Sequence, residues 1–274
     1  MFILPEFRVP YAEYRARQSK HEECGNKLKE SLESYDFSTL DSISFIVKLP
    51  SEIPMASDSR WANRQFRAVN TVQNSACVAF VSKVILNFFG IDIPMEDLLT
   101  EIENKGYRLW RLADRKKKTL NMAYPDVEQI KKEFPEDDPI WQCKTLEEIY
   151  QLCGKPEGIG CSMFVIDNII NYIAKKPIDV YRDTRIQSID KLLWNLEHGI
   201  VVPLRVQNSI YHDDPNRKEG HCVTLFGISH GKAIVVDTSF DGANGINILP
   251  AEQLINAMLW NKGLICAWDL SSCI

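Results

Sequence analysis

The sequence contains no long hydrophobic run. Nowhere in its 274 residues does it show the roughly 18 consecutive apolar residues that a membrane-spanning helix needs. The first ten residues include a proline and lack both a basic cluster and a long apolar core, so they do not resemble a cleavable signal peptide. We therefore expect a soluble chain without a membrane span, located in the cytoplasm or exported without a cleavable signal peptide.

Positive charge is scarce relative to negative charge. The chain has 32 Lys and Arg residues against 37 Asp and Glu residues, for a formal net charge of −5. The one basic run, residues 115–118, contains no interleaved aromatic residue and is typical of a solvated loop. This balance argues against a nucleic-acid-binding protein, and we expect no nucleic-acid partner.

Cysteine pairs at metal-binding spacing are also absent. The eight cysteines are spread widely, with neither a CxxC pair nor a zinc-type combination with histidine. We expect most of them to be free thiols in a reducing compartment, and we expect no metal and no other cofactor. The cysteines are Cys24, Cys77, Cys143, Cys153, Cys161, Cys222, Cys266 and Cys273.

The hydrophobic pattern changes along the chain. Apolar residues at helical spacing dominate the middle, and strand-like apolar stretches dominate the last third, where the turn at 229–232 predicts an antiparallel hairpin. We predict helices from about 75 to a stop at Gly90, and over 95–105, 126–134, 146–153, 163–174, 188–199 and 251–260. We predict strands over 66–72, 178–183, 200–206, 221–228, 232–239 and 264–270. Helices followed by an antiparallel sheet are typical of an α+β domain.

The N-terminal part differs from the rest. Residues 1–60 are charged at first and then loop-like, with two prolines and several small polar residues at 48–59. We interpret 1–60 as an N-terminal extension, either a pro-segment or a binding arm, and 61–274 as the main domain.

Cys77 lies where a polar stretch gives way to the apolar helix. A sulfur at a helix N-terminus lies close to unpaired backbone N–H groups and to the positive end of the helix dipole, and both stabilise a thiolate. Taken alone, a buried structural thiol is the more common case. Cys161, which follows a glycine-rich turn, is an alternative nucleophile, although it lacks a flanking amide.

A reactive thiolate needs a proton acceptor, and imidazole has a suitable pKa near neutral pH. Of the five histidines, only His221 opens an apolar strand directly after a glycine. Asp237 lies sixteen residues further on, at the end of the next strand, and the hairpin between the strands brings the two positions together. A structural histidine and a turn-capping aspartate are the alternatives. Cys222 is expected to point away from His221 into the core.

An amide precedes the cysteine by four residues. Gln73 is a candidate donor to an oxyanion, together with the backbone N–H of Cys77, and Asn74 is a possible substitute. For Gln73 considered alone, a surface amide without a catalytic role is the favoured interpretation. The order Gln73, Cys77, His221 and Asp237 on elements that can converge nevertheless favours a joint catalytic role.

Three segments carry a resemblance to a known family. "QNSACVAF", "GHCVTLFGI" and "IVVDTSF" resemble the three blocks of papain-like cysteine peptidases, nearest to the branch of bacteriocin double-glycine leader peptidases. The resemblance covers roughly residues 66–270 and implies a helical subdomain carrying the cysteine, packed against an antiparallel sheet carrying the histidine and the aspartate. Val78 stands where leader peptidases usually have glycine, and nothing in 1–60 matches the family blocks.

These observations predict a cysteine hydrolase that cleaves a peptide or isopeptide amide bond through a thioester on Cys77. The same residues can catalyse acyl transfer or side-chain deamidation if an amine replaces water or a glutamine side chain replaces the peptide bond. A non-catalytic module that uses a papain-like fold as a binding platform is the alternative from another class. We expect a peptide or protein substrate, whereas the pattern leaves the cleavage sequence and the oligomeric state open.

Overall fold

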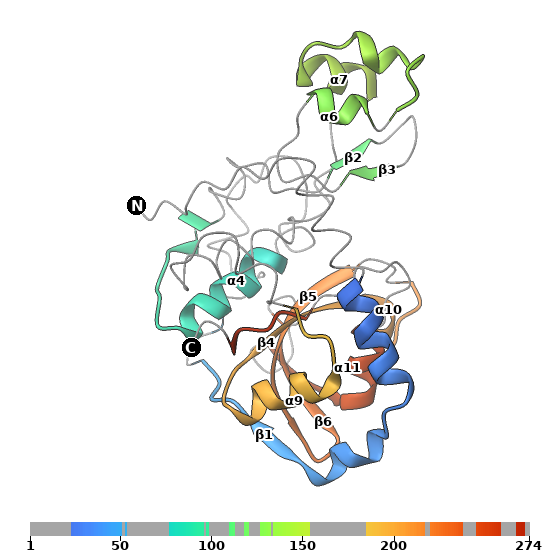
Figure 1. Ribbon diagram of the computed structural model, residues 1–274. Helices are drawn as coiled ribbons and strands as arrows, with labels where there is room; N and C mark the ends of the chain where they lie inside the picture. Colours follow the sequence, from blue (N-terminus) through green and yellow to red (C-terminus); the bar gives the residue numbers. More distant parts are fainter. Residues whose placement is uncertain are drawn as a thin grey trace.

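The computed structural model describes most of the C-terminal half of the chain and parts of the N-terminal half (Figure 1). The described residues are 23–50, 53, 77–95, 97–98, 110–112, 118–120, 127–132, 134–153, 185–216, 220–237, 245–258 and 267–271. They form a mixed helix and sheet fold with an antiparallel sheet, which confirms the predicted α+β class.

A five-stranded antiparallel sheet organises the C-terminal half. Its order is β1-β5-β6-β7, and β4 also pairs with β5. β6 pairs with one edge of β5 over residues 224–229. The other edge of β5 is shared by two strands, of which β4 pairs with residues 220–225 and β1 with residues 227–229. The strands are β1 (Ser44–Ile46), β4 (Val202–Gln207), β5 (Gly220–Ser229), β6 (Lys232–Val236) and β7 (Ile246–Pro250).

The predicted hairpin joins β5 and β6. Ser229 pairs with Lys232, and the two residues between them have φ values of 48° at His230 and 70° at Gly231. Two consecutive residues with positive φ are typical of a type I′ turn, whose twist matches that of the flanking strands. The hairpin therefore brings the beginning of β5 alongside the end of β6.

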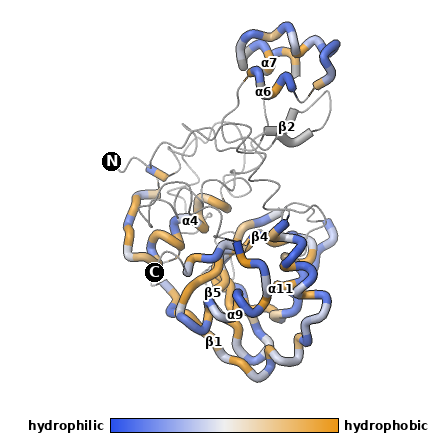
Figure 2. Tube along the Cα trace, viewed as in Figure 1, coloured by the Kyte–Doolittle hydropathy of each residue, from blue (hydrophilic) through white to orange (hydrophobic). Residues whose placement is uncertain are grey.

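The core lies on both faces of β5. All eight residues from 221 to 228 are buried, so the alternating side chains of this strand are covered on each face. Figure 2 shows hydrophobic residues concentrated along α4 and the strands. Among the described residues, four helices contact the sheet: α4 (Cys77–Phe88) against β5, α9 (Ile189–Glu197) against β1, β4 and β5, α10 (Asn208–Tyr211) against β4, and α11 (Ala251–Met258) against β4, β6 and β7.

The helix that begins at Cys77 is buried along most of its length. Every residue from Cys77 to Leu86 is buried, so this helix lies in the interior instead of exposing a polar face. It ends at Phe88, just before the predicted stop at Gly90, whose φ of 72° is a left-handed conformation that glycine adopts without strain. The Ile91 N–H then donates to the Leu86 carbonyl at 2.8 Å, which closes the helix end.

Other predicted helices are present in the structure, and some of their ends differ from the predicted bounds. α9 begins after Ser188, whose hydroxyl accepts from the Lys191 N–H at 3.2 Å, and it stops before Gly199, which has a φ of 75°. α7 (Leu146–Cys153) has the predicted bounds, and α6 (Val127–Lys131) is shorter than predicted. Among the described residues, no helix is long and apolar enough to cross a membrane.

Some strand predictions differ from the structure. Within the predicted strand 264–270, the described residues Ala267 and Trp268 make only isolated bridges, to Leu204 and Arg185. β7 and the small hairpin of β2 (Trp110–Leu112) and β3 (Lys118–Leu120) were not predicted. The predicted elements at 66–72, 163–174 and 178–183, and most of 95–105, lie outside the described residues.

The described part of the predicted extension packs into the same core as the sheet. Residues 23–33 are helical, with Leu28 and Leu32 in the main hydrophobic cluster. The short 3₁₀ helix η1 (Phe37–Ser42) then leads into β1, which pairs with β5. The hydrophobic core therefore extends across the boundary predicted at residue 60. The role of 1–60 as a pro-segment or binding arm stays a prediction.

A second, smaller core lies away from the sheet. It contains Ile130, Phe134, Ile140, Cys143 and Ile149, which come from α6, α7, the 3₁₀ helix η2 (Pro139–Gln142) and the segments beside them. Figure 1 shows α6 and α7 at the opposite end of the molecule from β1 and α9.

Gly227 is expected to be essential for the close approach of β1 to β5. A Cβ atom at this position would lie 2.6 Å from the Phe45 carbonyl oxygen and 3.0 Å from the Ile46 Cα. Both are backbone atoms, so Gly227→Ala must displace β1. We expect a loss of about 1–3 kcal/mol in the free energy of unfolding, measured by urea denaturation.

Ser229→Ala is the control for this prediction, since it removes only the hydroxyl that lies 2.8 Å from the Ser44 hydroxyl. We expect it to cost about 1 kcal/mol or less. Equal stability of the two variants would contradict the steric argument at Gly227.

Candidate active site

Three of the four predicted catalytic residues come together at the N-terminus of α4. Cys77 is the first residue of this helix, and α4 packs against β5, which carries His221 near its beginning. The His221 ring and the side chain and backbone of Cys222 lie close enough to the Cys77 sulfur to lower its pKa. Cys77 is 9% exposed and His221 is 7% exposed, so both lie just below the surface.

Asp237 is hydrogen-bonded to the His221 ring. His221 lies at the second position of β5, opposite Val206 of β4, and Asp237 directly follows β6. The distance from His221 Nε2 to Asp237 Oδ1 is 2.8 Å, and Asp237 is completely buried. Since Nε2 faces Asp237, Nδ1 is the ring nitrogen left for Cys77. The backbone N–H of Asp237 donates to the Gly245 carbonyl at 2.8 Å, which fixes the residue after the strand.

The surroundings of Cys77 favour its thiolate. The hydrogen bond from the Cys222 side chain is the largest influence and lowers the pKa of Cys77. Burial opposes this effect, but the hydrogen bond to His221, the charge of that ring and the Cys222 backbone N–H all act in the same direction as the Cys222 side chain. The pKa of Cys77 therefore lies well below the ordinary thiol value.

The surroundings of His221 favour its charged form. Burial lowers the pKa of this imidazole, yet the charge and the hydrogen bond of Asp237, followed by those of Cys77, outweigh burial and raise the pKa of His221 to about 10. A lowered pKa at the thiol and a raised pKa at the imidazole both favour a thiolate–imidazolium ion pair. This ion pair is the activated form of a cysteine nucleophile.

Cys222 departs from its predicted orientation. It is buried in the core as expected, at 4% exposure, but its side chain also contacts the Cys77 sulfur. Strand alternation places Cys222 and His221 on different faces, whereas the tip of α4 lies close enough to the strand to meet both. The alternation of side chains along one strand does not predict the contact between Cys222 and Cys77, because Cys77 belongs to another element.

Tyr211 and Asn247 extend the site behind Asp237, and sequence reasoning did not single out either of them. Burial, followed by the charge of Asp237, raises the pKa of Tyr211, and Asn247 Nδ2 donates to the Tyr211 hydroxyl at 3.0 Å. The alternating apolar residues of 246–250 are a weak strand signal that was not used to predict a strand there, and nothing in it indicated a role for Asn247.

The remaining histidines occupy different places. The His212 ring centroid lies 6.5 Å from that of His221, so this residue borders the site although its sequence context suggested only a polar loop. His198 stacks on Trp194 at the end of α9, and His230 lies in the hairpin turn.

The predicted oxyanion donor Gln73, its substitute Asn74 and the alternative nucleophile Cys161 lie outside the described residues. Their roles stay predictions. The first N–H groups of a helix have no partner within the helix, which makes the backbone N–H of Cys77 a candidate oxyanion donor.

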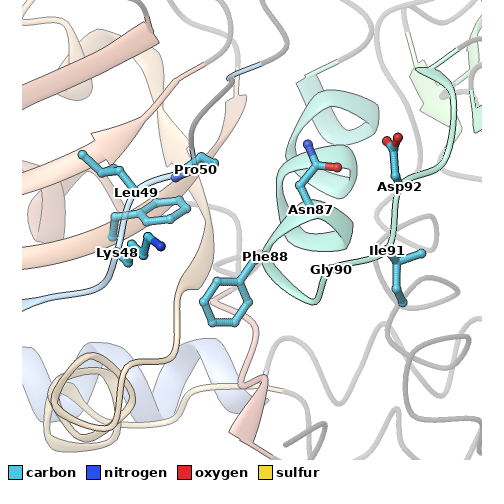
Figure 3. Close-up of a pocket in the computed structure, with 9 residues that line it drawn as sticks. Lys48, Leu49, Pro50, Asn87, Phe88, Gly90, Ile91 and Asp92 are labelled. Atoms are coloured by element: carbon cyan, nitrogen blue, oxygen red, sulfur yellow. The ribbon is translucent and has the colours of Figure 1, made fainter.

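A hollow of about 810 Å³ lies at the other end of α4 (Figure 3). A helix of 12 residues is roughly 18 Å long, so this hollow is a separate feature from the Cys77 site. Figure 3 shows the segment around Leu49 on one side of it and the end of α4 on the other. Its lining residues are Lys48, Leu49, Pro50, Asn87, Phe88, Gly90, Ile91, Asp92 and Phe226.

Neither a disulfide nor a metal cluster involves the site residues. Cys24, Cys77, Cys143 and Cys222 are free thiols. Within the part of the chain that the structure describes, no group of three or more His, Cys, Asp or Glu side chains is arranged to hold a metal ion. The chemistry that this arrangement supports is nucleophilic attack by a sulfur, with proton transfer by an oriented imidazole.

Asp237→Asn is expected to lower the pH at which His221 loses its proton. The carboxylate charge outweighs burial and raises the pKa of His221 to about 10, so removal of that charge lets the pKa fall. We expect a decrease of about 1–3 pH units, measured by ¹⁵N NMR titration of histidine-labelled protein. The exposed Asp190→Asn variant is the control and should titrate like the wild type. An unchanged His221 titration in Asp237→Asn would contradict the assigned ion pair.

Comparison of the chain with protein-family models, with curated proteins and with solved structures found no match.

Proposed function

We propose that the protein is a cysteine hydrolase that cleaves a peptide or isopeptide amide bond. The observation that carries this proposal is a single chain of contacts. The thiol at the tip of a buried helix lies beside the His221 ring, whose Nε2 lies 2.8 Å from the buried carboxylate of Asp237. Cys77 is the nucleophile, His221 the general acid and base, and Asp237 the residue that orients the ring.

The reaction begins with attack of the Cys77 thiolate on the carbonyl carbon of the substrate amide. The carbonyl oxygen of the tetrahedral intermediate carries the negative charge, which the Cys77 backbone N–H and Gln73 stabilise. The C–N bond breaks as the His221 imidazolium gives its proton to the departing amine, which leaves a thioester on Cys77. Neutral His221 then removes a proton from water, the resulting hydroxide attacks the thioester, and the acid product leaves with Cys77 again a thiolate.

Asp237 acts through the imidazole and stays ionised throughout. Its carboxylate fixes the ring so that Nδ1 faces the sulfur, and it stabilises the imidazolium that protonates the amine. Complete burial of Asp237 strengthens this interaction, because no water competes for the carboxylate oxygen.

A papain-like architecture is consistent with this assignment, and we propose it together with the relation to double-glycine leader peptidases. Two features support it. The nucleophile is carried by a helix that packs against the sheet, and the imidazole and the carboxylate follow on neighbouring antiparallel strands or directly after them.

Cysteine labelling tests the proposal. The protein is treated with iodoacetamide at pH 6, and modified cysteines are mapped by mass spectrometry over time. We expect Cys77 to react far faster than the other seven cysteines, because its surroundings lower its pKa and favour the thiolate. Uniform slow labelling would contradict the proposal and favour a non-catalytic binding module.

Product analysis separates the reactions that share a thioester. Peptide mixtures are incubated with the protein in H₂¹⁸O. Hydrolysis splits a peptide and places ¹⁸O in the new carboxyl group, whereas acyl transfer joins the acyl part to an added amine. Deamidation converts a glutamine side chain without splitting the peptide. We expect split peptides that carry ¹⁸O.

A further inference from the structure

Residues 23–50 add a strand to one edge of β5. β1 pairs antiparallel with residues 227–229 of that strand, and the Val47 N–H donates to the Phe226 carbonyl at 2.7 Å, which continues the ladder beyond β1. Peptides that bind by adding a strand to a sheet edge gain affinity from main-chain hydrogen bonds of this kind. The segment is therefore bound to β5 in the way that a separate peptide would be.

Main-chain hydrogen bonds also join the segment to the turn between β5 and β6. The His230 N–H donates to the Ile43 carbonyl at 2.9 Å, and the Gly231 N–H donates to the Leu40 carbonyl at 3.0 Å. Both donors are the turn residues with positive φ, and both acceptors lie in η1 or next to it. The segment thus holds the tip of the hairpin as well as the edge of the strand.

Side chains of the segment enter the main hydrophobic core and meet the start of α9. The Ser31 hydroxyl accepts from the Ile189 N–H at 3.2 Å, and Ile189 is the first residue of α9, where helix N–H groups lack partners within the helix. Burial of apolar side chains is the dominant favourable contribution to association of this kind. Four aliphatic side chains of the segment are in the main core and at most 4% exposed: Leu28, Leu32, Leu40 and Val47.

β1 and the residues after it support the end of the sheet that is remote from the candidate site. His221 lies six residues before Gly227, the first β5 residue that pairs with β1, so roughly 20 Å of strand separates them. Residues 48–50 line the hollow at the end of α4, whereas Cys77 begins that helix (Figure 3). A segment that inhibited the site by covering it would have to lie at the opposite ends of β5 and α4.

We propose that residues 23–50 are a permanent part of the folded domain, held by the β5 edge, the β5–β6 turn and the start of α9, and that they stay bound if the chain is cut between residues 51 and 76. Such a cut would give a two-chain molecule and would not remove a pro-segment. The inference goes beyond the proposed function and does not depend on it, because a domain with an inert Cys77 would hold the segment by the same contacts.

A cut introduced into the full chain tests this inference. A recognition sequence for a site-specific protease, flanked by flexible Gly-Ser spacers, is inserted between residues 60 and 61. The protein is cut under native conditions, the cut is verified by denaturing electrophoresis, and the product is applied to size-exclusion chromatography. We expect the two pieces to elute together at the volume of the uncut protein and to separate only in denaturant. Separate elution of the smaller piece in native buffer would overturn the inference.

A pair of variants in the cut protein tests which contacts hold the segment. Leu28 is 1% exposed, whereas the adjacent Lys29 is exposed and its ion pair with Glu33 lies at the surface. We expect Leu28→Ala to raise the dissociation constant between the two pieces by at least about 20-fold, measured from the fraction that elutes together on dilution. Lys29→Ala is the matched control and should leave this constant unchanged. Equal dissociation constants in the two variants would contradict the role of the buried face.

This inference and the proposed function fail in different experiments. Dissociation of the cut protein would overturn the inference and leave the proposed function in place, since iodoacetamide labelling of Cys77 is measured on the uncut chain. Slow labelling of Cys77 in the uncut chain would overturn the proposed function and leave the inference about residues 23–50 in place.

Discussion

Cys77→Ser is expected to abolish covalent capture of an electrophilic peptide probe while leaving the fold intact. The change is nearly isosteric, so the tip of α4 should keep its packing against β5. A serine hydroxyl is far less acidic than a thiol, and the groups that stabilise the thiolate in the wild type cannot ionise it. We expect turnover of any substrate to fall by at least about 10⁴-fold, with probe capture read by intact-protein mass spectrometry.

Cys143→Ser is the matched control for this prediction. Cys143 is a buried free thiol in the smaller hydrophobic core, so the same chemical change there should leave probe capture unchanged. Near-identical thermal unfolding of both variants and the wild type would show that the loss is chemical. Full labelling of Cys77→Ser would instead move the nucleophile to Cys161.

His221→Asn is expected to cause the second largest loss of turnover and of Cys77 reactivity. The variant removes the imidazole whose hydrogen bond and charge help to lower the pKa of Cys77, and it removes the group that protonates the departing amine. Asparagine keeps an N–H donor near Asp237, which limits the cost of leaving a buried carboxylate without its partner. We expect iodoacetamide labelling of Cys77 at pH 6 to approach that of an ordinary thiol, and turnover to fall by at least about 10³-fold.

The corresponding control is His198→Asn, which changes an exposed histidine at the end of α9. That ring stacks on Trp194, so its replacement should leave the reactivity of Cys77 unchanged. If His221→Asn retains rapid labelling at pH 6, the thiolate is stabilised mainly by Cys222 and the helix N-terminus, and His221 is not the base. The loss of turnover in Asp237→Asn should be smaller than that in Cys77→Ser or His221→Asn, because Asp237 orients the ring and does not itself react.

Local patterns in the sequence were sufficient to locate the elements of the candidate site. The apolar spacing that ends at Gly90 predicted the helix that begins at Cys77, because a helix interior and its glycine stop are properties of neighbouring residues. The turn at His230 and Gly231 predicted the hairpin, and the hairpin predicted that Asp237 reaches His221. Each of these inferences depends on short-range stereochemistry.

Other features involve residues far apart in the chain, and local spacing does not encode them. The contact of Cys77 with Cys222 depends on how α4 packs across β5, and the packing of residues 23–50 into the main core depends on the pairing of β1 with β5. β7 was missed because its alternation is short and follows a polar stretch. The assignment of Asn247 as a neighbour of Tyr211 required the register between β6 and β7.

Local patterns were enough to predict that a thiol starts an apolar helix and that an imidazole and a carboxylate face each other across a hairpin, since these features follow from hydrophobic period, turn chemistry and strand pairing within a few residues. The contact of the thiol with the imidazole, and the position of Tyr211 and Asn247 near the carboxylate, are properties of the folded molecule. They depend on burial and helix packing between segments that are distant in the chain, which set the angle at which α4 crosses the sheet and the depth at which each polar group lies.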